Sequence, residues 1–283
     1  MHRRTFLTGL AAGAAWGAAR WARAAEPWPM RLSCSSIAFA SLPIEEACAR
    51  IAGLGFEAID IWSPHAKCPH LDDVQNRLGP AGLTELLAKH RLKLFAFSVY
   101  AGGYAKYAEL LGKVGGGVAV RGSARKVDPQ ELTAAMQKFL ETLKPELERA
   151  EQYNGYLAIE NHGNALLDSV DSFKAFVDLN RNPRLGLAIA PYHLQGINAS
   201  VEEVIGISGR QLFFFYAWQR GAGVEQLPGH GPSDFAPWLA ALAKAGYAHY
   251  VNPFMHHEPP PDEMAPALAR ACQYLKQCHA KVL

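Results

Sequence analysis

The sequence predicts a single α/β domain folded as a closed (β/α)8 barrel. Eight short apolar runs with strand character alternate with eight amphipathic helical stretches. The length of 283 residues suits one barrel, which commonly uses about 250 residues. No linker or composition shift divides the chain, and no glycine fingerprint of a nucleotide-binding sheet follows the first strand. These observations favour one barrel over two smaller domains or a doubly wound sheet.

The eight expected strands are apolar almost throughout. Such runs are typical of parallel strands that are covered on both faces. In chain order, the strands are expected at residues 32–39, 58–62, 94–100, 117–121, 156–160, 185–190, 212–218 and 250–253.

Helices are expected between the strands, at residues 44–53, 82–90, 104–111, 129–153, 169–179, 201–205, 234–244 and 262–279. Asp128 and Pro129 form a start signal for the fourth helix, and Gly53 is a stop signal for the first. Pro145 should kink or split the long fourth helix. The third unit has the least room, because the glycines at 115–117 leave a short connection to the next strand.

The first 24 residues are expected to form a signal peptide of the twin-arginine type. Arg3 and Arg4 precede Phe6, an apolar run rich in alanine and glycine follows, and Arg23 lies just before the expected cleavage site. That run is too short and too rich in glycine for a membrane anchor. We therefore expect a mature barrel of residues 25–283 that is periplasmic or secreted, with no membrane segment.

Charge and cysteine content limit the partners of the barrel. The formal net charge is +2, but the first 24 residues hold four arginines and no acid, which leaves 24 basic against 26 acidic residues. A body without a basic block argues against nucleic acid or an anionic membrane as a partner. No GxxxxGK motif is present, so no nucleotide cofactor is expected. The five cysteines form no CxxC pair, and we expect buried thiols.

Polar and aromatic residues follow the predicted strands at the end where a barrel carries its active site. Aromatic rings stack on the apolar faces of sugars, while amides, imidazoles and carboxylates bind their hydroxyls. The sequence therefore predicts a pocket for a small carbohydrate. The expected substrate-binding residues are Trp62, His65, His162, Tyr192, Trp218, Asn252 and His256. For the histidines and tryptophans, a purely structural role in the wall is the alternative.

Glu160 and His193 are the catalytic candidates. Glu160 closes the apolar run 156–159, where an ionised side chain is costly unless it is paired, bound to a metal or facing a cavity. An ion pair with a neighbouring strand is the alternative for Glu160. His193 follows the sixth strand, and its alternative is a hydrogen-bonded wall residue.

At these strand ends the sequence resembles the sugar phosphate isomerase/epimerase family, whose xylose isomerase-like TIM barrel is related to endonuclease IV. The matching segments are GLGFEAID at 53–60, LAIENHG at 157–163, residues 185–187 with 192–194, and residues 233–235 with 245–247. The resemblance implies a divalent cation held at four strand ends: Glu on strand 5, Asp on strand 6, His or Gln on strand 7 and Glu on strand 8.

Of these four ligands only Glu160 clearly matches. The Asp position is Ala190, the strand 7 position falls within 214–217, and Asn252 replaces the strand 8 carboxylate. One carboxylate cannot hold Mg or Mn tightly, because hard cations require several oxygen ligands.

Two possibilities follow for the cofactor. Either the metal is absent, or a remodelled set that includes Glu160, His193 and Gln219 binds one divalent ion, with Mn, Zn, Co and Mg as candidates. By the same resemblance, His193 matches the family histidine beside the substrate.

The missing second carboxylate disfavours a two-base epimerase. One-base chemistry is still feasible, in which Glu160 or His193 takes a proton alpha to a carbonyl and imidazoles or amides stabilise the enediolate. The sequence thus predicts an exported isomerase or lyase that acts on a sugar. The alternative is a non-catalytic carbohydrate-binding barrel with a degenerate metal site. A nuclease is disfavoured, because the rim offers too few ligands for three zinc ions.

Overall fold

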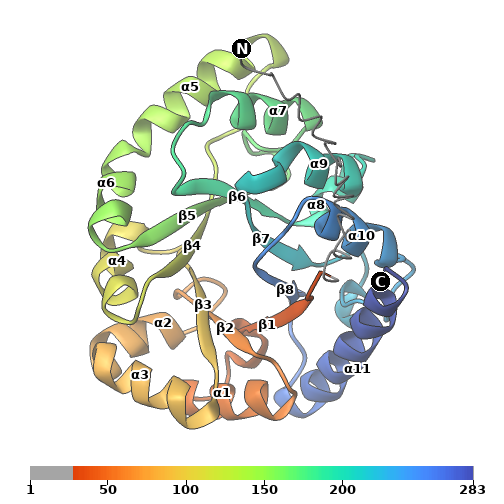
Figure 1. Cartoon of the computed structure of the whole chain (residues 1–283). Coiled ribbons are helices and arrows are strands. Elements are labelled where there is room, and N and C mark those ends of the chain that lie inside the picture. Colours follow the sequence, from red (N-terminus) through yellow and green to blue (C-terminus); the bar gives the residue numbers. More distant parts are fainter. Residues whose placement is uncertain (1–27, 283) are drawn as a thin grey trace, which may run out of the picture.

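Eight parallel strands close into a barrel in the order of the chain, and helices surround it (Figure 1). The computed structural model describes residues 28–282. The barrel closes where Arg31 of the first strand pairs with Tyr250 of the last. The strands are β1 Arg31–Ser35, β2 Ala58–Trp62, β3 Lys93–Ser98, β4 Gly117–Gly122, β5 Gly155–Glu160, β6 Leu185–Ile189, β7 Leu212–Ala217 and β8 Tyr250–Pro253. The predicted (β/α)8 barrel is confirmed.

The longer helices pack their apolar faces against the outside of the barrel. They are α1 Ile44–Gly53, α3 Gly79–His90, α4 Tyr104–Lys113, α5 Leu132–Thr142, α6 Lys144–Gln152, α7 Val170–Leu179, α9 Val201–Ser208, α10 Ala236–Lys244 and α11 Pro261–Ala280. Pro145 lies in the first turn of α6, so the expected helix at 129–153 is split there, as predicted. A 3-10 turn, Pro129–Glu131, precedes α5.

Two apolar cores result from this arrangement. The larger core lies between the strands and the helices, and the smaller one fills the interior of the barrel. Inside the barrel, Phe95 stacks on Phe214 with ring centroids 4.8 Å apart, beside small residues such as Ala158 and Ala188. Large and small side chains thus fill the interior, as they do in a packed barrel. This core supports the polar groups at the carboxyl ends of the strands.

The structure differs from the predicted elements in three regions. The first strand ends at Ser35 instead of residue 39, because Ser36–Phe39 turns into a 3-10 helix whose Ser36 hydroxyl accepts a hydrogen bond from the Trp62 backbone. A short helix α2, His70–Asp73, and a π-turn, Val74–Leu78, precede α3. A third short helix, α8 Pro191–Gly196, follows β6 and carries two of the candidate site residues. Short elements of this kind have no clear periodic signal in a sequence.

The expected signal peptide at residues 1–24 lies outside the described residues. Within residues 28–282, no helix combines the length and the apolar character that a membrane span requires. All five cysteines are buried and free, as the sequence predicted.

The connection between α4 and β4 gives a test of the packing. Gly115 and Gly116 both have positive φ, at 106° and 85°. A Cβ at Gly115 would meet open space, whereas one at Gly116 would collide with the carbonyl oxygen of Asn154. Gly115→Ala should cost about 1–2 kcal/mol from backbone strain alone. Gly116→Ala should cost about 1–3 kcal/mol more, because it adds overpacking. Urea unfolding of the two variants measures this difference, and equal losses would contradict the packing described here.

Candidate active site

A cavity of about 350 Å³ opens at the carboxyl ends of β2 to β6. This is the end at which (β/α)8 barrels carry their sites. Its wall combines a carboxylate, a phenol, imidazoles and an indole, the groups that a polar ring-shaped ligand requires. The lining residues are Trp62, His65, Tyr100, Gly122, Ser123, Ala124, Arg125, Glu160, His162, Gly163, Asn164, Ala165, His193 and His256.

Glu160 is the last residue of β5 and reaches the cavity from inside the barrel. It is only 7% exposed. Its Oε2 accepts a hydrogen bond of 2.6 Å from the Tyr100 hydroxyl. None of the described residues bonds to its Oε1. This atom is not fully buried, so it is accessible from the cavity. One oxygen of the carboxylate is therefore fixed, while the other is open to the cavity.

Burial raises the pKa of Glu160 to about 7, because a carboxylate is less stable away from water. The hydrogen bond from Tyr100 and the charge of His162 act in the opposite direction, and the nearby Asp60 adds to the rise. A carboxyl group with this pKa exchanges its proton near neutral pH. Such a value is well matched to a general base.

Tyr100 holds the carboxylate of Glu160 in place. Its hydroxyl lies 3.1 Å from that of Tyr216 on β7, so a chain of two phenols ends on Glu160. Burial raises the pKa of both phenols well above the usual range, and they remain protonated donors. Tyr100 was not among the expected site residues. It is the last residue of the predicted third strand, and the site of a barrel lies at that end of its strands.

A second buried carboxylate, Asp60, lies in the layer beneath the cavity. It is fully buried and accepts hydrogen bonds from Ser35 at 2.7 Å, from Ser98 at 2.9 Å and from the Trp62 indole at 2.7 Å. Burial raises its pKa to about 7 despite these donors. Asp60 does not line the cavity, and its effect is to fix the indole of Trp62, which does. Asp60 lies in the predicted second strand, at 58–62, and was not among the expected site residues.

His193 lies on α8, next to His162 at the end of β5. Their ring centroids are 4.1 Å apart. Asn161 joins the two segments, since its side chain accepts a hydrogen bond of 2.7 Å from the Ala190 backbone and donates one of 3.2 Å to the carbonyl of the same residue. Asn161 belongs to the LAIENHG segment and was not among the expected site residues.

The imidazole of His193 is kept neutral. Burial lowers its pKa to about 3, and the charges of His162 and His256 act in the same direction. Its Nε2 is buried and has no hydrogen-bond partner among the described residues. An unpaired buried nitrogen is costly, and a substrate oxygen in the cavity would satisfy it.

Trp62, His65 and His256 form another part of the wall. The indole of Trp62 lies 6.2 Å from the His65 ring and 5.9 Å from the His256 ring, measured between centroids. Burial lowers the pKa of His256 to about 4, so this imidazole is also neutral near pH 7. The structure thus brings Trp62, His65, His162, His193 and His256 together around Glu160.

Four of the predicted residues do not line this cavity. Tyr192 stacks on Trp218 at 4.3 Å, and the Trp218 indole donates a hydrogen bond of 2.8 Å to Gln226, so this pair backs the His193 side of the wall. Gln219 is fully buried and uses both ends of its amide on the backbone of Leu227 and Ser233.

Asn252 also lies outside the cavity lining. It is fully buried, where its amide nitrogen donates to Ser33 at 3.0 Å and its oxygen accepts from Ser35 at 3.2 Å. Both ends of its amide are therefore occupied within the barrel, next to the Asp60 layer.

The four strand ends that the resemblance assigns to a cation do not fit one. Only Glu160 offers a carboxylate, Ala190 has no donor atom, and Tyr216 holds its proton. The fourth position is Asn252, whose amide is already hydrogen-bonded. Within residues 28–282, no three or more His, Cys, Asp or Glu side chains gather as a possible metal site. Hard cations need several oxygen ligands, and this set supplies one.

Solved structures share this fold at low sequence identity. A xylose isomerase-like TIM barrel/4-hydroxyphenylpyruvate dioxygenase fusion protein is 17% identical with a TM-score of 0.66, over 88% of this chain and 43% of the fusion protein. The apo 3-keto-D-glucoside 4-epimerase YcjR from E. coli is 14% identical with a TM-score of 0.66, over 87% of this chain and 100% of that one. The IolI protein with a bound zinc atom is 18% identical with a TM-score of 0.68, over 90% and 99%.

The chain thus spans less than half of the fusion protein and nearly the full length of the other two. No curated protein is significantly similar to it. A family model described as the xylose isomerase-like TIM barrel matches residues 48–278. Together with the closed eight-stranded barrel, this match shows that the chain belongs to the xylose isomerase-like TIM barrel family.

Proposed function

We propose that the chain is a sugar isomerase or keto-sugar lyase that removes a proton alpha to a carbonyl with a single base, Glu160. The observation that carries this proposal is the carboxylate of Glu160, which is held by Tyr100 through one oxygen and open to the cavity through the other. The 3-keto-D-glucoside 4-epimerase from E. coli supports sugar chemistry on this barrel. The aromatic and imidazole wall supports a carbohydrate as the ligand.

In the first step, Oε1 of Glu160 takes the proton from the carbon next to the carbonyl. The electrons of the broken C–H bond form the enediolate, and the carbonyl oxygen gains negative charge. Tyr100 stays bonded to Oε2 and keeps the open oxygen directed at the substrate. The chemistry uses only side chains of the chain itself, because its residues do not fit the family's cation.

Imidazoles then stabilise the negative oxygen. His193 presents a buried Nε2 without a partner, and in the tautomer protonated there it donates a hydrogen bond to the enediolate. His162 lies 4.1 Å away between ring centroids and contributes a second polar edge. The hydroxyl of the deprotonated carbon then passes its proton to the negative oxygen, and return of the proton from Glu160 to the former carbonyl carbon gives isomerisation. Loss of a beta substituent together with its bonding electrons gives elimination instead.

A non-catalytic carbohydrate-binding barrel is the second candidate function. It is favoured by the incomplete family ligand set, in which Ala190 and Asn252 stand where the resemblance places carboxylates. The same wall of Trp62, His65 and His256 would then bind a sugar without turnover.

We also propose that the barrel works outside the cytoplasm, in the periplasm or after secretion. Paired Arg3 and Arg4 before an apolar alanine- and glycine-rich run support export by the twin-arginine route. A small carbohydrate is the proposed partner.

Glu160→Gln is the direct test of the catalytic proposal. We expect solvent deuterium exchange into D-fructose, D-xylulose or 3-keto-D-glucose, followed by proton NMR in D2O, to fall by about 10²- to 10⁴-fold. Binding of the same sugar should change by only a few-fold, because the amide keeps the shape of the side chain. Glu148→Gln, on the exposed surface of α6, is the matched control and should keep full exchange. If neither wild type nor variant exchanges any probe and both bind sugar equally, the binding barrel is the correct function.

The rate should follow the ionisation of Glu160 as the pH changes. Glu160 acts as a base only when ionised, so kcat/KM should fall about tenfold per pH unit below about pH 7 and level off above it. The pKa of His193 is about 3, so its imidazole stays neutral between pH 5 and 9 and does not change kcat/KM in that range. A rate that is flat between pH 5 and 7 would contradict the role of Glu160.

Tyr100→Phe should move this profile. Loss of the phenol removes the hydrogen bond that stabilises the Glu160 carboxylate, so the apparent pKa should rise above about 7. Tyr216→Phe is the control, because its hydroxyl contacts Tyr100 and does not bond to Glu160. We expect a smaller shift in that variant. An unchanged pKa in Tyr100→Phe would show that the phenol does not hold the base.

A further inference from the structure

Arg125 is the only lysine or arginine among the described residues that line the cavity. It lies on the loop between β4 and α5. The only carboxylate in the same lining is Glu160, and two of the imidazoles there, those of His193 and His256, are neutral near pH 7. A permanent positive charge thus lies in the same lining as the carboxyl group of Glu160.

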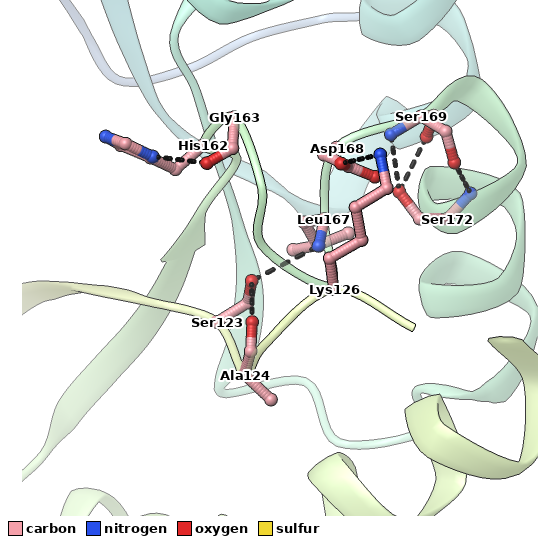
Figure 2. Close-up of polar contacts among 9 residues, drawn as sticks. All are labelled: Ser123, Ala124, Lys126, His162, Gly163, Leu167, Asp168, Ser169 and Ser172. Carbon is pink, nitrogen blue, oxygen red and sulfur yellow. Dashed lines mark hydrogen bonds and ion pairs between the residues drawn. The ribbon is translucent and has the colours of Figure 1, made fainter. Parts of the chain in front are cut away.

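The backbone around Arg125 is fixed by pairing with the loop that follows β5. Gly122 pairs with Glu160 at the end of β4 and β5, and beyond the barrel Arg125 forms an antiparallel bridge with Ala165. The Leu166 backbone donates a hydrogen bond of 2.7 Å to the carbonyl of Ala124. The Ser123 hydroxyl accepts one of 3.2 Å from the Leu167 backbone, which Figure 2 shows. Arg125 therefore projects from a paired strip and not from a free loop.

Arg125 and Lys126 are neighbours in this extended segment, and their side chains point to different faces of it. Lys126 pairs with Asp168 at 2.6 Å, as Figure 2 shows, and it lines a different hollow beside Pro129 and Leu132. Because successive side chains of an extended segment point to opposite faces, Arg125 is directed to the cavity.

Arg125 also has no acid to neutralise it. Within residues 28–282, no carboxylate forms an ion pair with its guanidinium, although the cations at 121 and 126 on the same segment are both paired. Three residues beyond the level of Glu160, an extended chain places Arg125 roughly 10 Å further along the strand direction.

From this arrangement we propose that Arg125 binds a carboxylate of the substrate, so that the substrate class is an acidic sugar such as a uronic or keto-aldonic acid. The inference rests on the proposed function in placing a sugar in this cavity. A guanidinium matches the planar carboxylate with two parallel hydrogen bonds. One guanidinium matches the single charge of a carboxylate, and no lysine or second arginine lines the described cavity to bind the second charge of a phosphate. The carboxylate would sit at the outer end of the cavity, with the reacting carbon near Glu160.

Calorimetric titration at low ionic strength with matched sugars tests this assignment. The probes are D-glucuronate with D-glucose, D-galacturonate with D-galactose, and D-glucose 6-phosphate. We expect wild type to bind at least one acid about 10- to 100-fold more tightly than its neutral partner. Arg125→Gln should remove this preference and leave the affinity for the neutral sugar unchanged. Lys126→Gln removes one positive charge from the next residue and should keep the preference.

Each other outcome overturns the proposal. Equal affinity for acid and neutral sugar, no binding of either acid, or a preference that survives in Arg125→Gln would show that the guanidinium does not select a carboxylate. Tighter binding of the phosphate ester than of both acids would assign the site to phosphate. Because the readout is binding, the result is independent of turnover. An acid preference without deuterium exchange into either the acids or the neutral keto-sugars would reject the catalytic function alone, and exchange on neutral keto-sugars without a preference would reject the acidic-sugar assignment alone.

Discussion

The burial of one carboxyl group at the end of β5 is the constraint on which the site depends. Glu160 follows an apolar strand, and the surrounding barrel removes most of its contact with water. This desolvation moves its pKa to about 7, while a single phenol keeps the ionised form accessible. A more polar environment would leave a permanently ionised and weakly basic carboxylate. A completely closed one would leave a neutral acid that no substrate could reach.

The neighbouring polar groups are held by the barrel in layers. Asp60 and its three donors lie below the cavity and fix Trp62, and Asn161 ties the end of β5 to the start of α8. These bonds are buried, so breaking one leaves an unpaired polar group and costs more than a surface bond would. The positions of the cavity side chains therefore follow from interactions one layer away from the ligand. The strip that carries Arg125 extends this support above the rim through backbone pairing.

Hydrogen-bond donors take the place of cation ligands at this rim. Three of the four strand ends that the family resemblance assigns to a cation hold side chains that are apolar, protonated or already bonded. Neutral imidazoles and a protonated phenol surround the remaining carboxylate instead. Donors fixed in a poorly solvated site can stabilise a developing negative oxygen without rearrangement. An arginine at the outer end would add orientation, because a guanidinium binds a carboxylate in one plane.

The sequence alone determined the barrel, most of its strands, the split at Pro145 and the place of Glu160 at the end of an apolar strand. Periodic apolar runs, proline geometry and the cost of a charge in an apolar strand are local properties, and they can be read without coordinates. The sequence could not decide which strand-end residues share one cavity. Asn252 and Gln219 end in buried hydrogen bonds, whereas Tyr100 and Arg125 reach the cavity, because side-chain direction depends on register, bulges and cross-loop pairing between segments far apart in the chain.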